Sequence, residues 1–151
     1  SLYVSSSEIT DRGVQHLATM KSLKRLSLES TAITGEALKT LAKLSLISLD
    51  LRDCNVIEAG LIHVAAHKEL QTLDLQNTGA TDAVLERLSQ LKDLRKITLQ
   101  STQVTDKGFL YLTKCPKLSE VWIAGTKITP DGVKKFKQAL PKCYVGQLSI
   151  E

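Results

Sequence analysis

A repeat of 23 or 24 residues runs through the whole chain, and it limits the possible folds more than any other feature. Five positions of each unit, the fourth, sixth, eleventh, sixteenth and nineteenth, hold an apolar residue in all six units. A fixed period of this length is typical of units that stack in a row, because one unit alone cannot bury its apolar face. A shorter unit, residues 1–22, comes first. The full units start at Leu23, Leu46, Leu70, Leu94 and Leu118.

The spacing of the apolar positions predicts one strand and one helix in every unit. Alternation at the fourth and sixth positions places two side chains on one face of a short strand. A spacing of three at the sixteenth, nineteenth and often twenty-second positions gives one face of a two-turn helix. We expect the first helix near 11–19 and the last near 130–139. The strands are expected to centre on Tyr3, Ser27, Asp50, Asp74, Thr98 and Trp122.

The turn between strand and helix carries further recurring residues. A threonine stands where a helix N-cap is expected, and an aspartate often follows it in the first turn. These residues are Thr10, Thr34, Thr81, Thr105 and Thr129, with Asp11, Asp82 and Asp106. A glycine later in the turn is expected to let the helix approach the strand of its own unit. The glycines are Gly13, Gly60, Gly108 and Gly132. A Ser, Thr or Cys at the ninth position is expected to bond turn backbone groups between neighbouring units.

The pattern LxxLxLxxTxITDxGLxxLxxL resembles the leucine-rich repeat family, and the resemblance covers nearly the whole chain. The turn is most similar to the short, helix-bearing repeats of bacterial proteins. It is also similar to the cysteine-containing repeats of eukaryotic F-box proteins, although only Cys54 fills the turn position that those repeats give to cysteine. The resemblance implies an α/β fold, a right-handed solenoid with a parallel sheet on its concave face and helices on its convex face.

The chain is expected to be a single leucine-rich repeat domain, residues 1–151, and a monomeric fragment of a larger protein. The truncated first unit would otherwise leave its apolar end face open. At the other end, Pro141 is expected to end the last helix. A cap of about residues 140–151 would follow and add an edge strand between 143 and 150.

Composition excludes several classes of protein. The hydrophobic content of 42% and the charged content of 24% are typical of a folded chain and argue against disorder. No apolar run approaches the ~20 residues of a membrane-spanning helix, and the first ten residues lack the pattern of a signal peptide. The net charge of +4 is too small to indicate nucleic acid by itself. The sequence does not indicate a compartment.

Few residues combine into a pattern for chemistry. His63 and His67 stand four apart on a predicted helix, as metal ligands do, but without a third ligand nearby we expect no metal. We expect His67 to be half-buried and His63 to face solvent. Cys115 is expected to be a core thiol, with a disulfide to Cys143 as the alternative. No catalytic triad, phosphate loop or HExxH motif occurs, and an open sheet offers no water-excluding cleft, so we expect neither an enzyme nor a cofactor.

The last unit and the residues just before it are rich in lysine. The residues concerned are Lys114, Lys117, Lys127, Lys134, Lys135, Lys137 and Lys142. They either bind nucleic acid or an anionic surface, or form a solvated convex face. We expect the solvated face and no nucleic-acid partner, because aromatic side chains that could stack on bases are not interleaved with these lysines.

The outward positions of the predicted sheet carry the candidate partner-binding residues. They are Tyr3, Arg25, Asp50, Arg52, Asp74, Lys96 and Trp122. The two aspartates should lie side by side on adjacent strands, and Trp122 is the only tryptophan. Either the two arginines neutralise the aspartates and Trp122 packs under the cap near Tyr144, or the carboxylates receive a Lys or Arg of a partner that Trp122 anchors.

The resemblance implies a non-enzymatic module that binds a protein or peptide on its concave sheet, although a fold alone does not give a function. Two alternatives stay open. The chain is either a structural spacer or terminal domain of a larger protein, or the substrate-recognition part of a ubiquitin-ligase adaptor. The adaptor would need F-box helices elsewhere in the protein.

Overall fold

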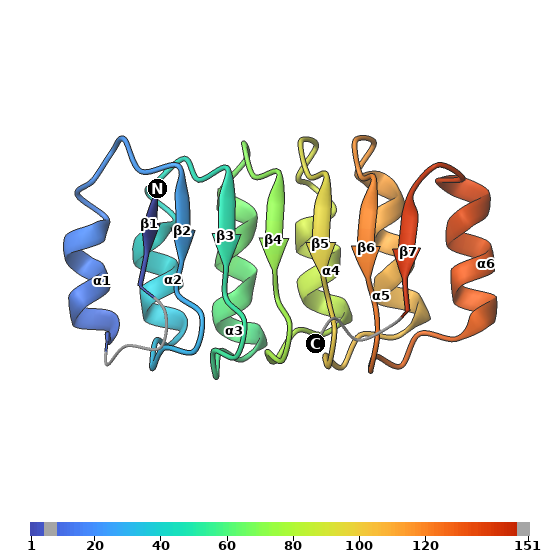
Figure 1. Ribbon diagram of the computed structural model, residues 1–151, viewed down its shortest axis with the longest axis horizontal. Helices are drawn as coiled ribbons and strands as arrows, with labels where there is room; N and C mark the ends of the chain where they lie inside the picture. Colours follow the sequence, from blue (N-terminus) through green and yellow to red (C-terminus); the bar gives the residue numbers. More distant parts are fainter. Residues whose placement is uncertain (5–8, 148–151) are drawn as a thin grey trace.

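The computed structural model describes residues 1–4 and 9–147, which form one parallel sheet with helices behind it. The seven strands lie in the order of the chain, so each strand pairs with its neighbours in sequence, as stacked units require (Figure 1). The strands are β1 (Leu2–Tyr3), β2 (Arg25–Ser27), β3 (Ser48–Asp50), β4 (Thr72–Asp74), β5 (Lys96–Thr98), β6 (Glu120–Trp122) and β7 (Tyr144–Gly146).

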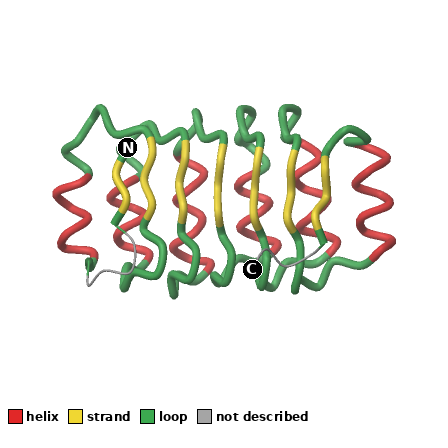
Figure 2. The backbone as a smooth tube through the Cα atoms, in the orientation of Figure 1, coloured by secondary structure: helices red, strands yellow, loops and turns green. Residues whose placement is uncertain are grey.

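A layer of helices covers one face of this sheet (Figure 2). The α-helices are α1 (Asp11–Leu17), α2 (Gly35–Leu41), α3 (Glu58–Leu61), α4 (Asp82–Leu88), α5 (Asp106–Tyr111) and α6 (Pro130–Ala139), with 3₁₀ helices η1 (Ile62–Ala66) and η2 (Leu112–Lys114). None of the described helices has the length and apolar character needed to cross a bilayer. We call the other face, which the described helices leave uncovered and which the sequence predicts to be concave, the open sheet face.

The predicted register is confirmed by the strand pairing and by burial. Leu26, Leu49 and Leu73 are partners on adjacent strands, and each is at most 2% exposed. The five apolar positions of the unit that starts at Leu23 are likewise at most 2% exposed. Of the same positions in the first unit only Val14 is fully buried, because that unit has a neighbour on one side only.

The bounds of the elements differ from the prediction in detail. The last helix covers the predicted residues 130–139, but the first ends at Leu17 rather than near residue 19. The strands end at the fifth position of the unit instead of centring on it. The expected edge strand is present as β7, while residues 148–151 of the predicted cap and residues 5–8 of the first unit lie outside the described part of the chain.

The helix predicted for the unit that starts at Leu46 is present, but only its first turn is α-helical. Helix α3 has four residues and passes directly into η1. Gly60 within α3 and the β-branched residues Ile62 and Val64 after it lower the helix propensity of this segment. The tighter 3₁₀ turn takes the place of the second α-helical turn.

A carboxylate at the start of four helices, α1, α3, α4 and α5, links each of them to the following repeat. The Asp82 carboxylate accepts hydrogen bonds from the backbone N–H of Thr105 at 2.8 Å and from the Thr105 hydroxyl at 2.6 Å. The same pair of bonds joins Asp106 with Thr129 and Asp11 with Thr34. Glu58 accepts a bond from the Thr81 hydroxyl. We call this series the carboxylate–threonine ladder. Its threonines occupy helix N-cap positions, as predicted. The hydrogen bonds between repeats were not predicted from the sequence.

Three of the recurring glycines, Gly60, Gly108 and Gly132, make room for the neighbouring repeat, whereas Gly13 makes room for the Ile9 side chain of its own unit. A Cβ built on Gly60 would lie 2.4 Å from the Cα atom of Gly35. A Cβ built on Gly108 would lie 2.2 Å from Oδ1 of Asp82. Real Cβ atoms do not approach other atoms this closely. The expectation of a close helix–strand contact is therefore wrong at both positions, because the first turns of adjacent helices are what meet there.

The turn after each of β2 to β6 repeats one backbone conformation. The residue at the eighth position has a positive φ in five units, namely Ser30, Asp53, Asn77, Ser101 and Gly125. The ninth side chain bonds mainly within its own unit and not between units, as Thr102 shows by donating to the Leu99 carbonyl at 2.6 Å. Cys54 instead donates to the Leu28 carbonyl of the preceding unit at 2.9 Å.

Candidate functional site on the open sheet face

Two aspartates lie side by side on the open sheet face. Asp50 of β3 is the direct partner of Asp74 of β4 in the parallel register, as the sequence predicted. Like charges on adjacent strands are unfavourable unless a cation lies close to both. The cation in this structure is Arg52, which follows Asp50 by two residues.

Arg52 is shared by three carboxylates. Its Nη2 atom lies 3.0 Å from Oδ2 of Asp50 and 3.3 Å from Oε2 of Glu29. Its Nε atom lies 3.6 Å from Oδ2 of Asp74. We call Glu29, Asp50, Arg52 and Asp74 the acidic cluster. One guanidinium faces three carboxyl groups, so the ionised cluster carries an excess of negative charge.

The environment of Asp74 makes its charged form costly. Burial is the main cause that raises the pKa of this carboxyl, and the charge of Asp50 raises it further. Opposing these effects, the Gln76 backbone N–H donates to Oδ1 at 3.0 Å and the Arg52 charge is close. On Arg52 the hydrogen bond to Asp50 is the largest cause that raises the guanidinium pKa. A further cation near Asp74 would therefore stabilise its ionised form.

A hollow of 170 Å³ lies next to the acidic cluster, over β1 to β4. Tyr3, Arg25, Asp50 and Asp74 are among the residues that line it. The Tyr3 side chain is 74% exposed, which leaves its ring accessible at the edge of the hollow. The fold thus brings five of the seven predicted partner-binding residues together, because Arg52 contacts both Asp50 and Asp74.

Arg25 does not neutralise the aspartates, contrary to one of the two interpretations of this face. Within the described part of the chain, the ion pairs of Asp50 and Asp74 are made by Arg52, whereas Arg25 lines the hollow. Sequence reasoning did not single out Glu29 as a partner of Arg52. A signal existed, because both residues occupy the seventh position of neighbouring units.

Lys96 and Trp122 belong to a second group further along the open sheet face. The Lys96 ammonium lies 2.7 Å from Oε1 of Glu120, which also accepts a hydrogen bond from the Trp122 indole at 2.5 Å. These two bonds, that of Lys96 first, lower the pKa of Glu120. The Trp122 ring meets the Tyr144 ring edge-on, with centroids 5.5 Å apart. This contact with the last strand is the one expected if Trp122 covers the end of the sheet.

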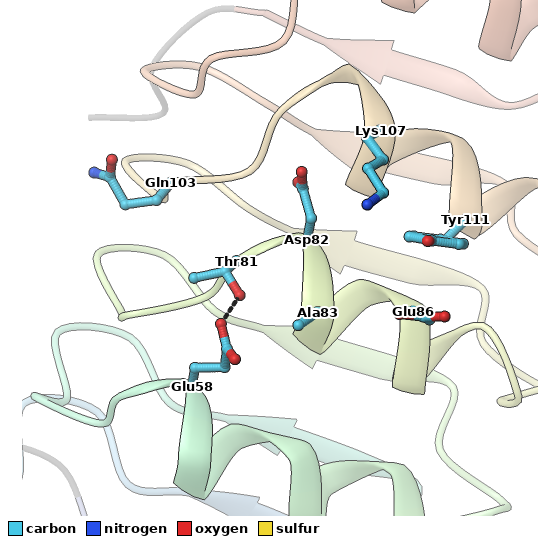
Figure 3. A pocket seen from close by; sticks show the side chains of 8 residues that line it. All are labelled: Glu58, Thr81, Asp82, Ala83, Glu86, Gln103, Lys107 and Tyr111. Atoms are coloured by element: carbon cyan, nitrogen blue, oxygen red, sulfur yellow. Dashed lines mark hydrogen bonds between the residues drawn. The ribbon is translucent and has the colours of Figure 1, made fainter.

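A larger hollow of 340 Å³ opens on the helix side, between α3, α4 and α5 (Figure 3). Its acidic lining includes Glu58 and Asp82. Figure 3 shows Glu58 accepting the hydrogen bond of the Thr81 hydroxyl. Asp82 likewise holds Thr105 in the ladder. Because these carboxylates already join neighbouring repeats, we regard this hollow as part of the scaffold.

His67 is fully buried rather than half-buried as predicted. It is 1% exposed, and its Nδ1 atom lies 2.8 Å from the Leu44 carbonyl oxygen of the preceding unit. The twenty-second position faces inward between two neighbouring units, which accounts for the difference. Burial lowers the pKa of this imidazole. Among the residues that the structure describes, no three His, Cys, Asp or Glu side chains group as metal ligands.

The cysteines are buried free thiols. The alternative disulfide between Cys115 and Cys143 is not formed, and Cys54 is also free. Burial raises the pKa of both Cys115 and Cys143 to about 11. Because the thiolate is the reactive form, such thiols are poor nucleophiles at neutral pH.

Comparison with known proteins identifies the architecture. Neither a protein-family model nor a curated protein sequence matches the chain. A leucine-rich repeat protein of Leptospira interrogans is similar in structure, with a TM-score of 0.66 and 24% identity, over 87% of this chain and 33% of its own. An internalin of Listeria monocytogenes has a TM-score of 0.57 and 17% identity, over 97% of this chain and 53% of its own. The chain therefore spans a third to about half of these proteins. Together with the parallel sheet backed by helices, these similarities show that it has the leucine-rich repeat solenoid fold.

Proposed function

We propose that this chain is a non-enzymatic module that binds a protein or peptide across the open sheet face. The observation that carries the proposal is the hollow over β1 to β4, where Tyr3, Arg25, Asp50 and Asp74 come together. Exposed aromatic and charged side chains around a depression are the usual anchors of a protein interface. At 170 Å³ the hollow is smaller than the roughly 300–1,000 Å³ of small-molecule pockets, which suits a side chain of a partner better than a reacting substrate.

The charge of the acidic cluster indicates the chemistry of the partner. Three carboxyl groups share the Arg52 guanidinium, so a Lys or Arg of the partner would complete their neutralisation. Asp74 would gain most, because burial already penalises its charge. The exposed Tyr3 ring offers a cation–π contact to the same partner side chain.

The second group gives the partner another contact. Lys96 is half-exposed and held by Glu120, so it presents a fixed positive charge. Trp122 is partly buried against Tyr144, and the remaining ring surface is available to a partner. A peptide that crosses the strands from the hollow to Trp122 would therefore meet negative, positive and aromatic features in turn.

Selection from a random peptide library on the immobilised protein tests this proposal. The enriched peptides should contain Lys or Arg, and their affinity should fall about tenfold in the double variant Asp50→Asn, Asp74→Asn, which removes charge but keeps side-chain volume. The matched control is Glu36→Gln with Glu86→Gln, which removes two exposed charges from the helix side. Equal losses in both variants, or no loss in either, would refute binding at the open sheet face.

The competing proposal is a structural spacer or terminal domain. It is supported by the finding that the chain spans only 33% and 53% of two longer proteins with the same fold. It predicts that library selection enriches no peptide. Assignment to the 24-residue bacterial type, and the ubiquitin-ligase adaptor suggested by F-box similarity, rest on the turn sequence alone.

A further inference from the structure

The lysines near the end of the chain gather on two adjacent helices and the turns beside them. Helices α5 and α6 are neighbours, and the stacked rings of Phe109 and Phe136 join them with centroids 4.1 Å apart. Six lysines lie on these helices and turns and are exposed: Lys107, Lys114, Lys127, Lys134, Lys135 and Lys142. We call them the helix-side lysine surface. None of the six forms an ion pair with another described residue.

The stacking of the units turns charge blocks in the sequence into charged regions of the molecule. Residues 46–93 contain four Lys or Arg and eight Asp or Glu. Residues 94–151 contain ten Lys or Arg and four Asp or Glu. Because the strands follow chain order, the first block is the middle of the solenoid and the second is one end. Positive charge is therefore concentrated at that end, although the whole chain has a net charge of only +4.

Two of the carboxylates at this end are already engaged. Asp106 holds Thr129 in the ladder, and Glu120 binds Lys96 on the open sheet face. Asp131, in the first turn of α6, is an exposed carboxylate beside the lysine surface, and the exposed Glu86 of α4 lines the same hollow as Lys107. Four of the six lysines lie on α6 or beside it, and Lys134 and Lys135 are adjacent in sequence. Charges closer than the Debye length of ~10 Å are little screened from one another, so such neighbours act together on a partner.

We propose that the helix-side lysine surface binds the anionic headgroup surface of a lipid bilayer. A lysine ammonium is a compact, hydrated point charge, suited to a diffuse negative potential. Nucleic-acid recognition commonly adds arginine forks and aromatic rings between the cations. The six residues include no arginine. The ring of the nearby Tyr111 is already engaged, because the Lys114 ammonium lies over it, 5.6 Å from the ring centroid. The helices lie on the opposite side from the open sheet face, so a bound molecule would keep that face accessible.

Co-sedimentation with vesicles tests the proposal directly. The purified protein is mixed with vesicles of phosphatidylcholine containing 30% phosphatidylserine, as a chosen condition of roughly physiological charge, or with phosphatidylcholine alone. Each lysine near an anionic bilayer strengthens binding about fivefold. The double variant Lys134→Glu, Lys135→Glu should therefore lower the partition coefficient at least about 25-fold. Binding of the unaltered protein should also weaken with salt.

The matched control is Lys39→Glu with Lys43→Glu, which reverses two exposed charges on and after α2, far from this end. It changes the net charge equally but should lower binding much less. Lys134→Gln with Lys135→Gln provides a second variant if charge reversal disturbs α6. Circular dichroism checks that both double variants are folded. Three results would overturn the proposal: no binding to anionic vesicles at low salt, equal losses in the control, or tighter lysine-dependent binding to duplex DNA than to vesicles.

Discussion

The two hydrogen bonds between Asp82 and Thr105 allow the contribution of contacts between repeats to the free energy of unfolding to be measured. The carboxylate accepts two hydrogen bonds from the next repeat, at 2.8 Å from the N–H and 2.6 Å from the hydroxyl. Both residues are half-buried, so water screens the contact only in part. Replacing Asp82 by alanine removes both acceptors and leaves the Thr105 N–H without its carboxylate.

The expected loss follows from the number and type of these bonds. A hydrogen bond to a charged group contributes about 1.5–3 kcal/mol. Partial exposure places each bond near the lower limit, so Asp82→Ala should lower the free energy of unfolding by about 2–3 kcal/mol. For a chain of this size, that corresponds to a decrease in Tm of roughly 5–10 °C. Thr105→Val removes one bond to Asp82 and the cap bond from the Lys107 N–H. This variant should lower the free energy of unfolding by about 1.5–2.5 kcal/mol.

Urea unfolding followed by circular dichroism, with both single variants and the double variant, separates the contact from other effects. The double-mutant cycle should give a coupling energy of about 1 kcal/mol. Glu86→Ala is the matched control, because it removes an exposed carboxylate from the same helix. If Asp82→Ala loses no more stability than Glu86→Ala, or if the cycle gives no coupling, the carboxylate–threonine ladder does not stabilise the array.

Two further outcomes are expected. Leu75→Ala, at a fully buried position in mid-sheet, should lower the free energy of unfolding by about 2–5 kcal/mol, and unchanged thermal stability would contradict the assigned core. The second outcome concerns His67. Burial lowers the pKa of its imidazole below the value in the unfolded chain, so the unfolded state binds the proton more readily. Stability should therefore fall as the pH drops below about 6.5, and His67→Leu should reduce this slope in urea unfolding between pH 7 and pH 5. A slope identical to that of the unaltered protein would show that His67 does not cause it.

The fold was predictable because burial in a stacked array is periodic. Leu26, Leu49 and Leu73 occupy the same position of successive units, so the sequence predicts which side chains face the core and which strands pair. The same logic placed Asp50 beside Asp74. It did not predict that Arg25 would leave the aspartates to Arg52, because position in a unit does not determine which conformation a long side chain adopts.

The ladder and the close glycine contacts were missed for a different reason. They depend on how the first turns of adjacent helices approach, and apolar spacing within one unit does not contain that information. One sign was present in the sequence. Gly35 stands where four other units have a carboxylate, and Ile57 stands where the next unit would supply the threonine. Both partners of one rung therefore change together. Ile57 is 66% exposed in the structure, at the place where this rung of the ladder is absent among the described residues.

Each rung of the ladder is made from one residue of a unit and one of the next. A gene segment encoding a 24-residue unit, duplicated in place, would therefore carry with it both the acceptor for its successor and the donor for its predecessor. The inserted copy would form complete contacts on both sides without any compensating substitution. Unequal crossing-over can thus change the number of repeats at little cost in stability, and the length of such an array can change faster in evolution than its surface chemistry.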